Sequence, residues 1–145
     1  MEEQHERIIE ESMGLFLKYG VRSITMDDVS RDLGISKKTL YKFVSNKADL
    51  ITQGVKSKYE QITELISGLS EKADNAIDEL LEIDLFFDQM MREQHPAMMF
   101  QLSKYYPETF KWLSKEKVSF VLSTTTKNLK RGMKEGLYRK DFNVD

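Results

Sequence analysis

The stretch that decides the fold is residues 25–44, TMDDVSRDLGISKKTLYKFV. Thr25 with an aspartate three residues later forms a capping box, which predicts that a helix begins at the next residue. Gly34 is placed to end that short helix, and Ser36 is placed to cap another over residues 37 to about 44. Two short helices joined by a turn that contains glycine predict a helix-turn-helix.

The sequence on both sides of this stretch is also helical. Ile9, Met13 and Phe16 recur at helical spacing, and Gly20 follows them as a C-terminal cap would. Asn46 is placed to cap the next helix, which makes a compact trihelical unit with the preceding ones. No long stretch alternates apolar and polar residues as a strand would. We therefore predict an all-α protein.

The second helix of a helix-turn-helix lies in the major groove of DNA, with its N-terminal residues against the base edges. Here Leu40 can face inward, which leaves hydroxyl groups and ammonium groups outside. From Lys18 to Lys47 there are seven basic residues against three acidic ones. Each residue alone could belong to an ordinary solvated surface, but together these donors suit phosphates and base acceptors. The pattern predicts DNA binding.

These residues resemble the TetR family of bacterial transcriptional regulators over about residues 5–51. The resemblance rests on four segments in the right order, which are Ile9 to Gly20, Thr25 to Val29, Gly34 to Tyr41, and Lys47 to Leu50. It departs from the family pattern at Val44, where an aromatic residue is usual, although Phe43 stands beside it. The resemblance implies that a phosphate is held by Thr25, Tyr41 and Lys47. The full set predicted to bind DNA is Thr25, Ser36, Lys37, Lys38, Thr39, Tyr41, Lys42 and Lys47.

Beyond residue 52 the apolar spacing stays helical, as in the run that begins with Ile77, Leu80 and Leu81. The resemblance implies a DNA-binding domain over 1–50 and a helical domain over 51–145 that binds an effector and dimerises. A small apolar or amphipathic effector suits the predicted pocket residues, which are Phe87, Met91, His95, Met99, Tyr105 and Trp112. Two alternatives stay open: these side chains form an ordinary core, and His95, which precedes Pro96, marks a helix boundary.

Family members usually continue past a segment like Gly136 to Asp141 into further helices that supply the dimer interface. We therefore expect the regulatory domain to be incomplete at the C-terminus, in a chain that is either naturally short or truncated. The resemblance also implies a homodimer when those helices are present.

Charge and composition exclude several other classes. There is no cysteine, so disulfides and thiolate metal sites are excluded, and no run of residues is apolar enough to span a membrane. The net charge is −7 over residues 57–103 and +5 over 104–145. We interpret the acidic stretch from Glu71 to Asp88 as a solvated helix face. The basic run Lys127, Lys130, Arg131 and Lys134 could form a second contact surface, but we interpret it as the polar side of the last helix. No catalytic motif, metal site or cofactor site is recognised. We expect a cytoplasmic protein.

The sequence thus predicts a sequence-specific repressor that a small-molecule effector releases from its operator in double-stranded DNA. Two alternatives come from other classes. One is a helical interaction protein that has lost DNA binding, which the retained lysines argue against. The other is a small helical enzyme, for which the sequence shows no titratable pair.

Overall fold

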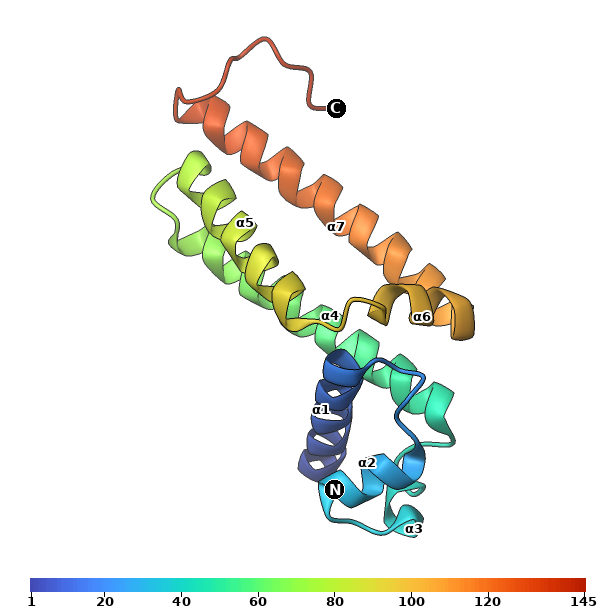
Figure 1. The fold of residues 1–145 in the computed structure, drawn as a ribbon. Coiled ribbons are helices and arrows are strands. Elements are labelled where there is room, and N and C mark those ends of the chain that lie inside the picture. The colour runs from blue at the N-terminus through green and yellow to red at the C-terminus, as the bar shows by residue number, and fades with distance from the viewer. The chain divides into compact units, whose positions relative to one another are not determined.

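The computed structural model describes all 145 residues and contains seven helices and no strand. The predicted all-α class is therefore confirmed. The helices are α1 (Glu2–Tyr19), α2 (Met26–Leu33), α3 (Lys37–Leu40), α4 (Lys47–Lys72), α5 (Ala76–Glu93), α6 (Met98–Tyr105) and α7 (Pro107–Lys134) (Figure 1). None of them is both long enough and apolar enough to cross a bilayer.

The chain forms two compact units, and two of its helices take part in both. The first unit holds residues 1–60 and 93–113, and the second holds 61–92 and 114–145. Both α4 and α7 begin in the first unit and end in the second. The functional division predicted at residue 50 stays a prediction, since packing groups the chain differently.

Caps predicted from the sequence are formed in the first unit. The hydroxyl of Thr25 accepts a hydrogen bond from the N–H of Asp28 at 3.1 Å, and the Asp28 carboxylate accepts one from the N–H of Thr25 at 2.9 Å. Likewise, the hydroxyl of Ser36 accepts from the N–H of Thr39 at 3.0 Å. Gly34 adopts the left-handed conformation, with φ of 66°, which ends α2 and opens the turn.

The recognition helix α3 is shorter than predicted. It ends at Leu40, whereas the sequence predicted a helix to about Val44. The N–H groups of Lys42 and Phe43 bond to carbonyls only three residues back, at 3.1 and 3.0 Å, which is the tighter winding of a 3₁₀ turn. The chain tightens there because Asn46 caps α4 only a few residues later, as predicted, and leaves no room for another α-helical turn.

The first unit has one continuous apolar core. Phe16 is 1 % exposed at its centre, and the stripe of α1 predicted from the sequence is buried with it. The core is not confined to the first three helices, because α4, α6 and α7 all contribute to it. Its members include Ile9, Met13, Phe16, Val21, Val29, Leu33, Leu40, Leu50, Ile51, Val55, Met98, Leu102 and Leu113.

One arginine of the second unit contacts several of its segments. Arg131 of α7 donates hydrogen bonds to the Glu79 carboxylate of α5 at 2.9 Å and to the carbonyl oxygens of Ser70 at 3.0 Å and Ala73 at 2.6 Å. It also donates to Glu135 at 3.3 Å. The prediction that Arg131 belongs to the solvated side of the last helix is therefore wrong: its guanidinium joins α7 to the α4–α5 hairpin.

The apolar face predicted for α5 exists, but much of it faces solvent. Leu80, Leu81 and Leu85 are 47, 58 and 69 % exposed, and Val121 on α7 is 56 % exposed. Helical periodicity correctly predicted the helix, whereas it carries no information on whether a partner covers its apolar face.

Candidate nucleic-acid interface

The predicted recognition segment carries its apolar and polar side chains on different sides. Leu40 is completely buried and Val44 is 3 % exposed, so both fix the segment to the core of the first unit. Lys38 and Lys42 are exposed, and Tyr41 is 45 % exposed. Because the apolar residues anchor the backbone from beneath, the donors outside are held at a defined place on the surface.

The lysines of this segment are not equivalent. The ammonium of Lys37 lies 3.1 Å from the carboxylate of Asp27 on α2, so its charge is partly compensated. Lys38 and Lys42 form no ion pair with any carboxylate of the chain. Their uncompensated charges make them the stronger candidates for contacts with phosphates or with guanine.

Two hydroxyl groups at the start of α3 serve the cap first. The Ser36 hydroxyl, which accepts from the Thr39 N–H, also lies 2.9 Å from the Thr39 hydroxyl. Only one of the two hydroxyl groups donates its hydrogen to the other. The hydroxyl group that accepts this bond keeps its own hydrogen for an acceptor on DNA.

Thr25 is also committed within the protein. Its hydroxyl donates to the Asp28 carboxylate at 2.8 Å while it accepts from the Asp28 N–H. A phosphate contact from this hydroxyl, as the resemblance implies, requires its hydrogen to turn away from Asp28. Arg31 was not among the residues predicted to bind DNA. Its guanidinium lies 3.5 Å from the other oxygen of Asp28, and its side chain is largely exposed.

We expect Asp28→Asn to remove a pH-dependent part of the stability. Hydrogen bonds from the backbone and the side chain of Thr25 hold the pKa of Asp28 below its ordinary value of 3.8. A carboxyl group with a lowered folded-state pKa stabilises the fold above the unfolded value, and this contribution is lost as the pH falls through the folded value. Melting temperatures measured from pH 6 downward should therefore fall more steeply below pH 3.8 in the wild type than in the variant.

Asp32→Asn is the matched control, because Asp32 lies on the same helix and has no hydrogen-bond partner. The interpretation is wrong if Asp28→Asn and Asp32→Asn change the acid dependence equally.

Lys47 lies where the sequence placed it, at the first position of α4. Its ammonium is 5.9 Å from the centroid of the Phe16 ring, and its side chain is half-buried. Burial lowers the pKa of Lys47, and the charge of Asp28 opposes that shift. The ammonium group and the positive N-terminal end of α4 repel each other, but both attract a phosphate.

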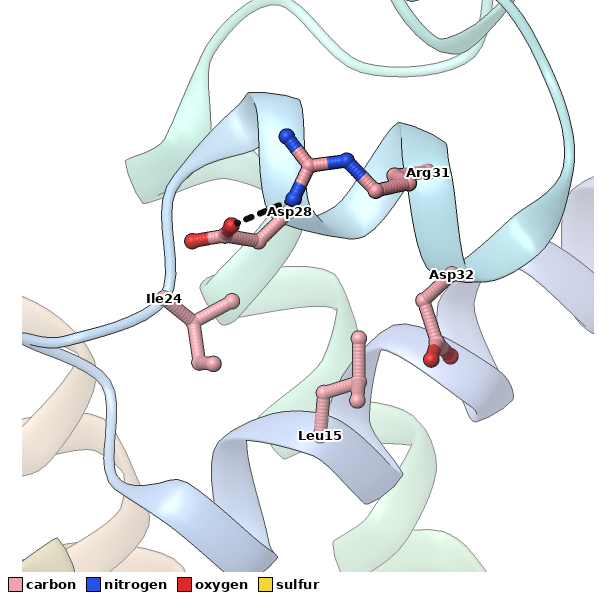
Figure 2. Close-up of a pocket in the computed structure, with 5 residues that line it drawn as sticks. All are labelled: Leu15, Ile24, Asp28, Arg31 and Asp32. Atoms are coloured by element: carbon pink, nitrogen blue, oxygen red, sulfur yellow. Dashed lines mark hydrogen bonds and ion pairs between the residues drawn. The ribbon is translucent and has the colours of Figure 1, made fainter.

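A shallow pocket lies between α1 and α2 and does not involve the recognition segment (Figure 2). Leu15 and Ile24 form its apolar side, and Asp28, Arg31 and Asp32 line the rest. With two carboxylates and one guanidinium, this surface is less suited to a phosphate backbone than the lysines of α3 are. No group of three histidine, aspartate or glutamate side chains is arranged to hold a metal ion.

The residues predicted to bind an effector fall in different units. Phe87 and Met91 belong to α5 in the second unit, where Phe87 is 36 % and Met91 is 61 % exposed. His95, Met99, Tyr105 and Trp112 belong to the first unit, and Met99 packs against its core. The effector site stays a prediction.

Three of those first-unit residues make contacts that also serve the fold. His95 lies at the boundary between α5 and α6, where its Nδ1 accepts from the N–H of Ala97 at 3.1 Å and its own N–H donates to the carbonyl of Leu17 at 2.7 Å. Trp112 meets the ring of Tyr59 edge-on, with centroids 5.5 Å apart. The Tyr105 hydroxyl accepts a hydrogen bond from Arg22.

Comparison with known proteins identifies the first helices. Residues 8–53 match the family model described as "Bacterial regulatory proteins, tetR family". These residues therefore form a domain of the TetR-family type. The matched segment comprises most of α1, all of α2 and α3, and the beginning of α4. The resemblance found in the sequence is confirmed.

Relatives of known function are regulators. A stretch of 105 residues is 29 % identical to the "Biofilm operon icaADBC HTH-type negative transcriptional regulator IcaR" of Staphylococcus aureus, which covers 72 % of this chain. The chain spans 56 % of the length of that relative, so it corresponds to a little over half of it.

Solved structures show that the TetR-family fold extends over nearly the whole chain. A TetR-family regulator from Mesorhizobium loti is similar over 95 % of this chain and 73 % of its own, with a TM-score of 0.72 and 17 % identity. The regulator PfmR of Thermus thermophilus is similar over 95 % of this chain and 76 % of its own, with a TM-score of 0.68 and 20 % identity.

Proposed function

We propose that this protein is a sequence-specific DNA-binding transcriptional regulator that represses its target genes. The observation that carries the proposal is a pair of exposed, unpaired cations, Lys38 and Lys42, on a segment that the buried Leu40 fixes to the core. The family of the domain supports DNA as the partner. The negative regulator IcaR supports repression rather than activation.

The proposed action needs two copies of the protein on one operator. In a dimer, the two recognition segments bind half-sites about one helical turn of DNA apart, so the operator shares the two-fold symmetry of the protein. A small apolar or amphipathic effector that binds more tightly to a dimer with another spacing shifts the population away from DNA. The candidate residues for that effector are those predicted from the sequence.

No observation favours the alternatives of an interaction protein or an enzyme. Lys38, Tyr41 and Lys42 are exposed on the predicted recognition segment, which supports a retained DNA-binding function. Both histidines have partners that serve the fold, since His5 bonds to Gln53 and His95 bonds to Ala97.

Selection of random DNA duplexes by the purified protein tests this proposal. We expect enrichment of one sequence with two-fold symmetry, and a Kd for it that rises steeply with salt because bound phosphates release counterions. Gel shift at several salt concentrations measures both. A protein that binds no duplex in a salt-sensitive manner contradicts the proposal.

A further inference from the structure

The end of the recognition helix depends on contacts from outside it. Because α3 stops at Leu40, Tyr41 and Lys42 lie on a tight turn rather than on a helix. The buried Leu40 and Val44 anchor this turn to the core at its two ends. Tyr41 and Lys42 are exposed between these anchors, so the contacts of the adjacent Phe43 also help to place them.

Phe43 is held by a histidine from the first turns of α1. The imidazole of His5 stacks on the Phe43 ring with centroids 5.7 Å apart and planes 20° from parallel. The same imidazole reaches α4, because its Nε2 lies 2.7 Å from Oε1 of Gln53. His5 thus touches both the end of the recognition turn and the helix that follows it.

The hydrogen bonds of Gln53 show which atom of its amide group faces His5. The Gln53 amide group donates to Asp49 at 3.0 Å, and the other oxygen of Asp49 accepts from the N–H of Ser45 at 2.8 Å. These bonds, that from Ser45 foremost, lower the pKa of Asp49, so the carboxylate is charged and can only accept. The carbonyl oxygen of Gln53 therefore faces His5, and Nε2 of His5 is the donor.

We propose that His5 is a positioning residue for DNA binding, which acts through Phe43 to place Tyr41 and Lys42 against the operator. Stacking fixes the Phe43 ring, and the bond to Gln53 fixes the imidazole. The arrangement gives a role to the aromatic side chain at position 43 beside the buried Val44. The inference rests on the proposed function, since it requires that the protein binds DNA.

Operator binding by His5 variants tests this, with the duplex that the wild-type protein selects. His5→Ala removes both contacts and should weaken binding about five- to tenfold, because one aromatic pair and one hydrogen bond are lost. His5→Phe keeps the stacking and should restore part of the affinity. Gln4→Ala is the matched control, since Gln4 is an exposed neighbour on α1, and it should leave the Kd unchanged.

Two further measurements separate positioning from a direct DNA contact and from loss of the fold. The slope of log Kd against log salt should stay as in the wild type for His5→Ala, because no cation that faces phosphate is removed. In a double-mutant cycle, His5→Ala should have little effect on affinity once Phe43→Leu is present. Melting temperatures of all variants show which of them remain folded at the binding temperature.

Each outcome decides one of the two ideas. If the wild type binds no duplex, the proposed function fails and the role of His5 falls with it. If the wild type binds the operator and the folded variants His5→Ala and His5→Phe bind it as tightly as the wild type does, the positioning role is wrong while the proposed function stands. If His5→Ala does not fold, His5→Phe and Phe43→Leu still decide, since full affinity in both contradicts the role.

Discussion

Replacing Lys38 and Lys42 together with glutamine is expected to weaken operator binding by roughly 100-fold, because each lysine contact contributes about 1–3 kcal/mol. Both side chains are exposed and unpaired, so the substitutions break no interaction within the protein and the fold should persist. The salt dependence should also change, since each lost phosphate contact lowers the slope of log K against log salt by about 0.9. Gel shift with the selected duplex at three or more salt concentrations measures both effects.

Lys127→Gln with Lys134→Gln provides a control that removes the same charge. Both lysines are exposed on α7 and belong to the basic run that could have formed a second contact surface. We expect a change in Kd of less than about threefold from the long-range field alone, which salt screens. Equal losses from the two double variants would show that net charge, and not the recognition segment, governs binding.

The largest effect on stability is expected from Arg131→Ala. The variant leaves the Glu79 carboxylate, whose side chain is 5 % exposed, without its cation. The remaining carboxylate is then shielded from water without a paired cation, which is unfavourable, so the loss of stability should exceed that from breaking an exposed pair. The carbonyls of Ser70 and Ala73 lose their donor as well. Urea unfolding followed by circular dichroism measures the difference.

Arg92→Ala is the matched control for this loss. Arg92 pairs with Asp88 at 2.9 Å, but their side chains are 77 and 58 % exposed, and such surface pairs contribute about 0–1 kcal/mol. A second variant, Arg131→Met with Glu79→Leu, replaces the pair by apolar side chains and should recover much of the stability. If Arg131→Ala costs no more than Arg92→Ala, the guanidinium does not hold the second unit together.

What the sequence predicted well is local. Thr25, Ser36 and Asn46 cap helices through bonds to residues three positions later, so their spacing alone reveals the caps. The buried Leu40 and the exposed lysines follow from helical periodicity in the same way. The proposed DNA-binding surface could be assembled from the sequence because all of its members lie within about twenty residues of one another.

The sequence could not predict the contacts between residues that are far apart along the chain. The contacts of His5 reach 48 residues along the chain to Gln53, and those of Arg131 reach 52 residues to Glu79. No spacing rule connects such positions, and a lysine-rich context made Arg131 look like one more solvated charge. The length of α3 was missed for a different, local reason: the cap at Asn46 was predicted, but its effect of shortening the preceding helix was not.

The shared core of the first unit bears on how such a protein can change over time. Ile51 and Val55 come from α4, Met98 and Leu102 from α6, and Leu113 from α7, yet all of them pack with α1–α3 in one cluster. A recombination event that exchanged only the first 50 residues would place the core side chains of a foreign α1–α3 against those of α4, α6 and α7, to which they are not complementary. The helices proposed to read DNA are therefore not an interchangeable module, and a change in the proposed operator specificity is more readily reached by substitutions on the exposed side of α3.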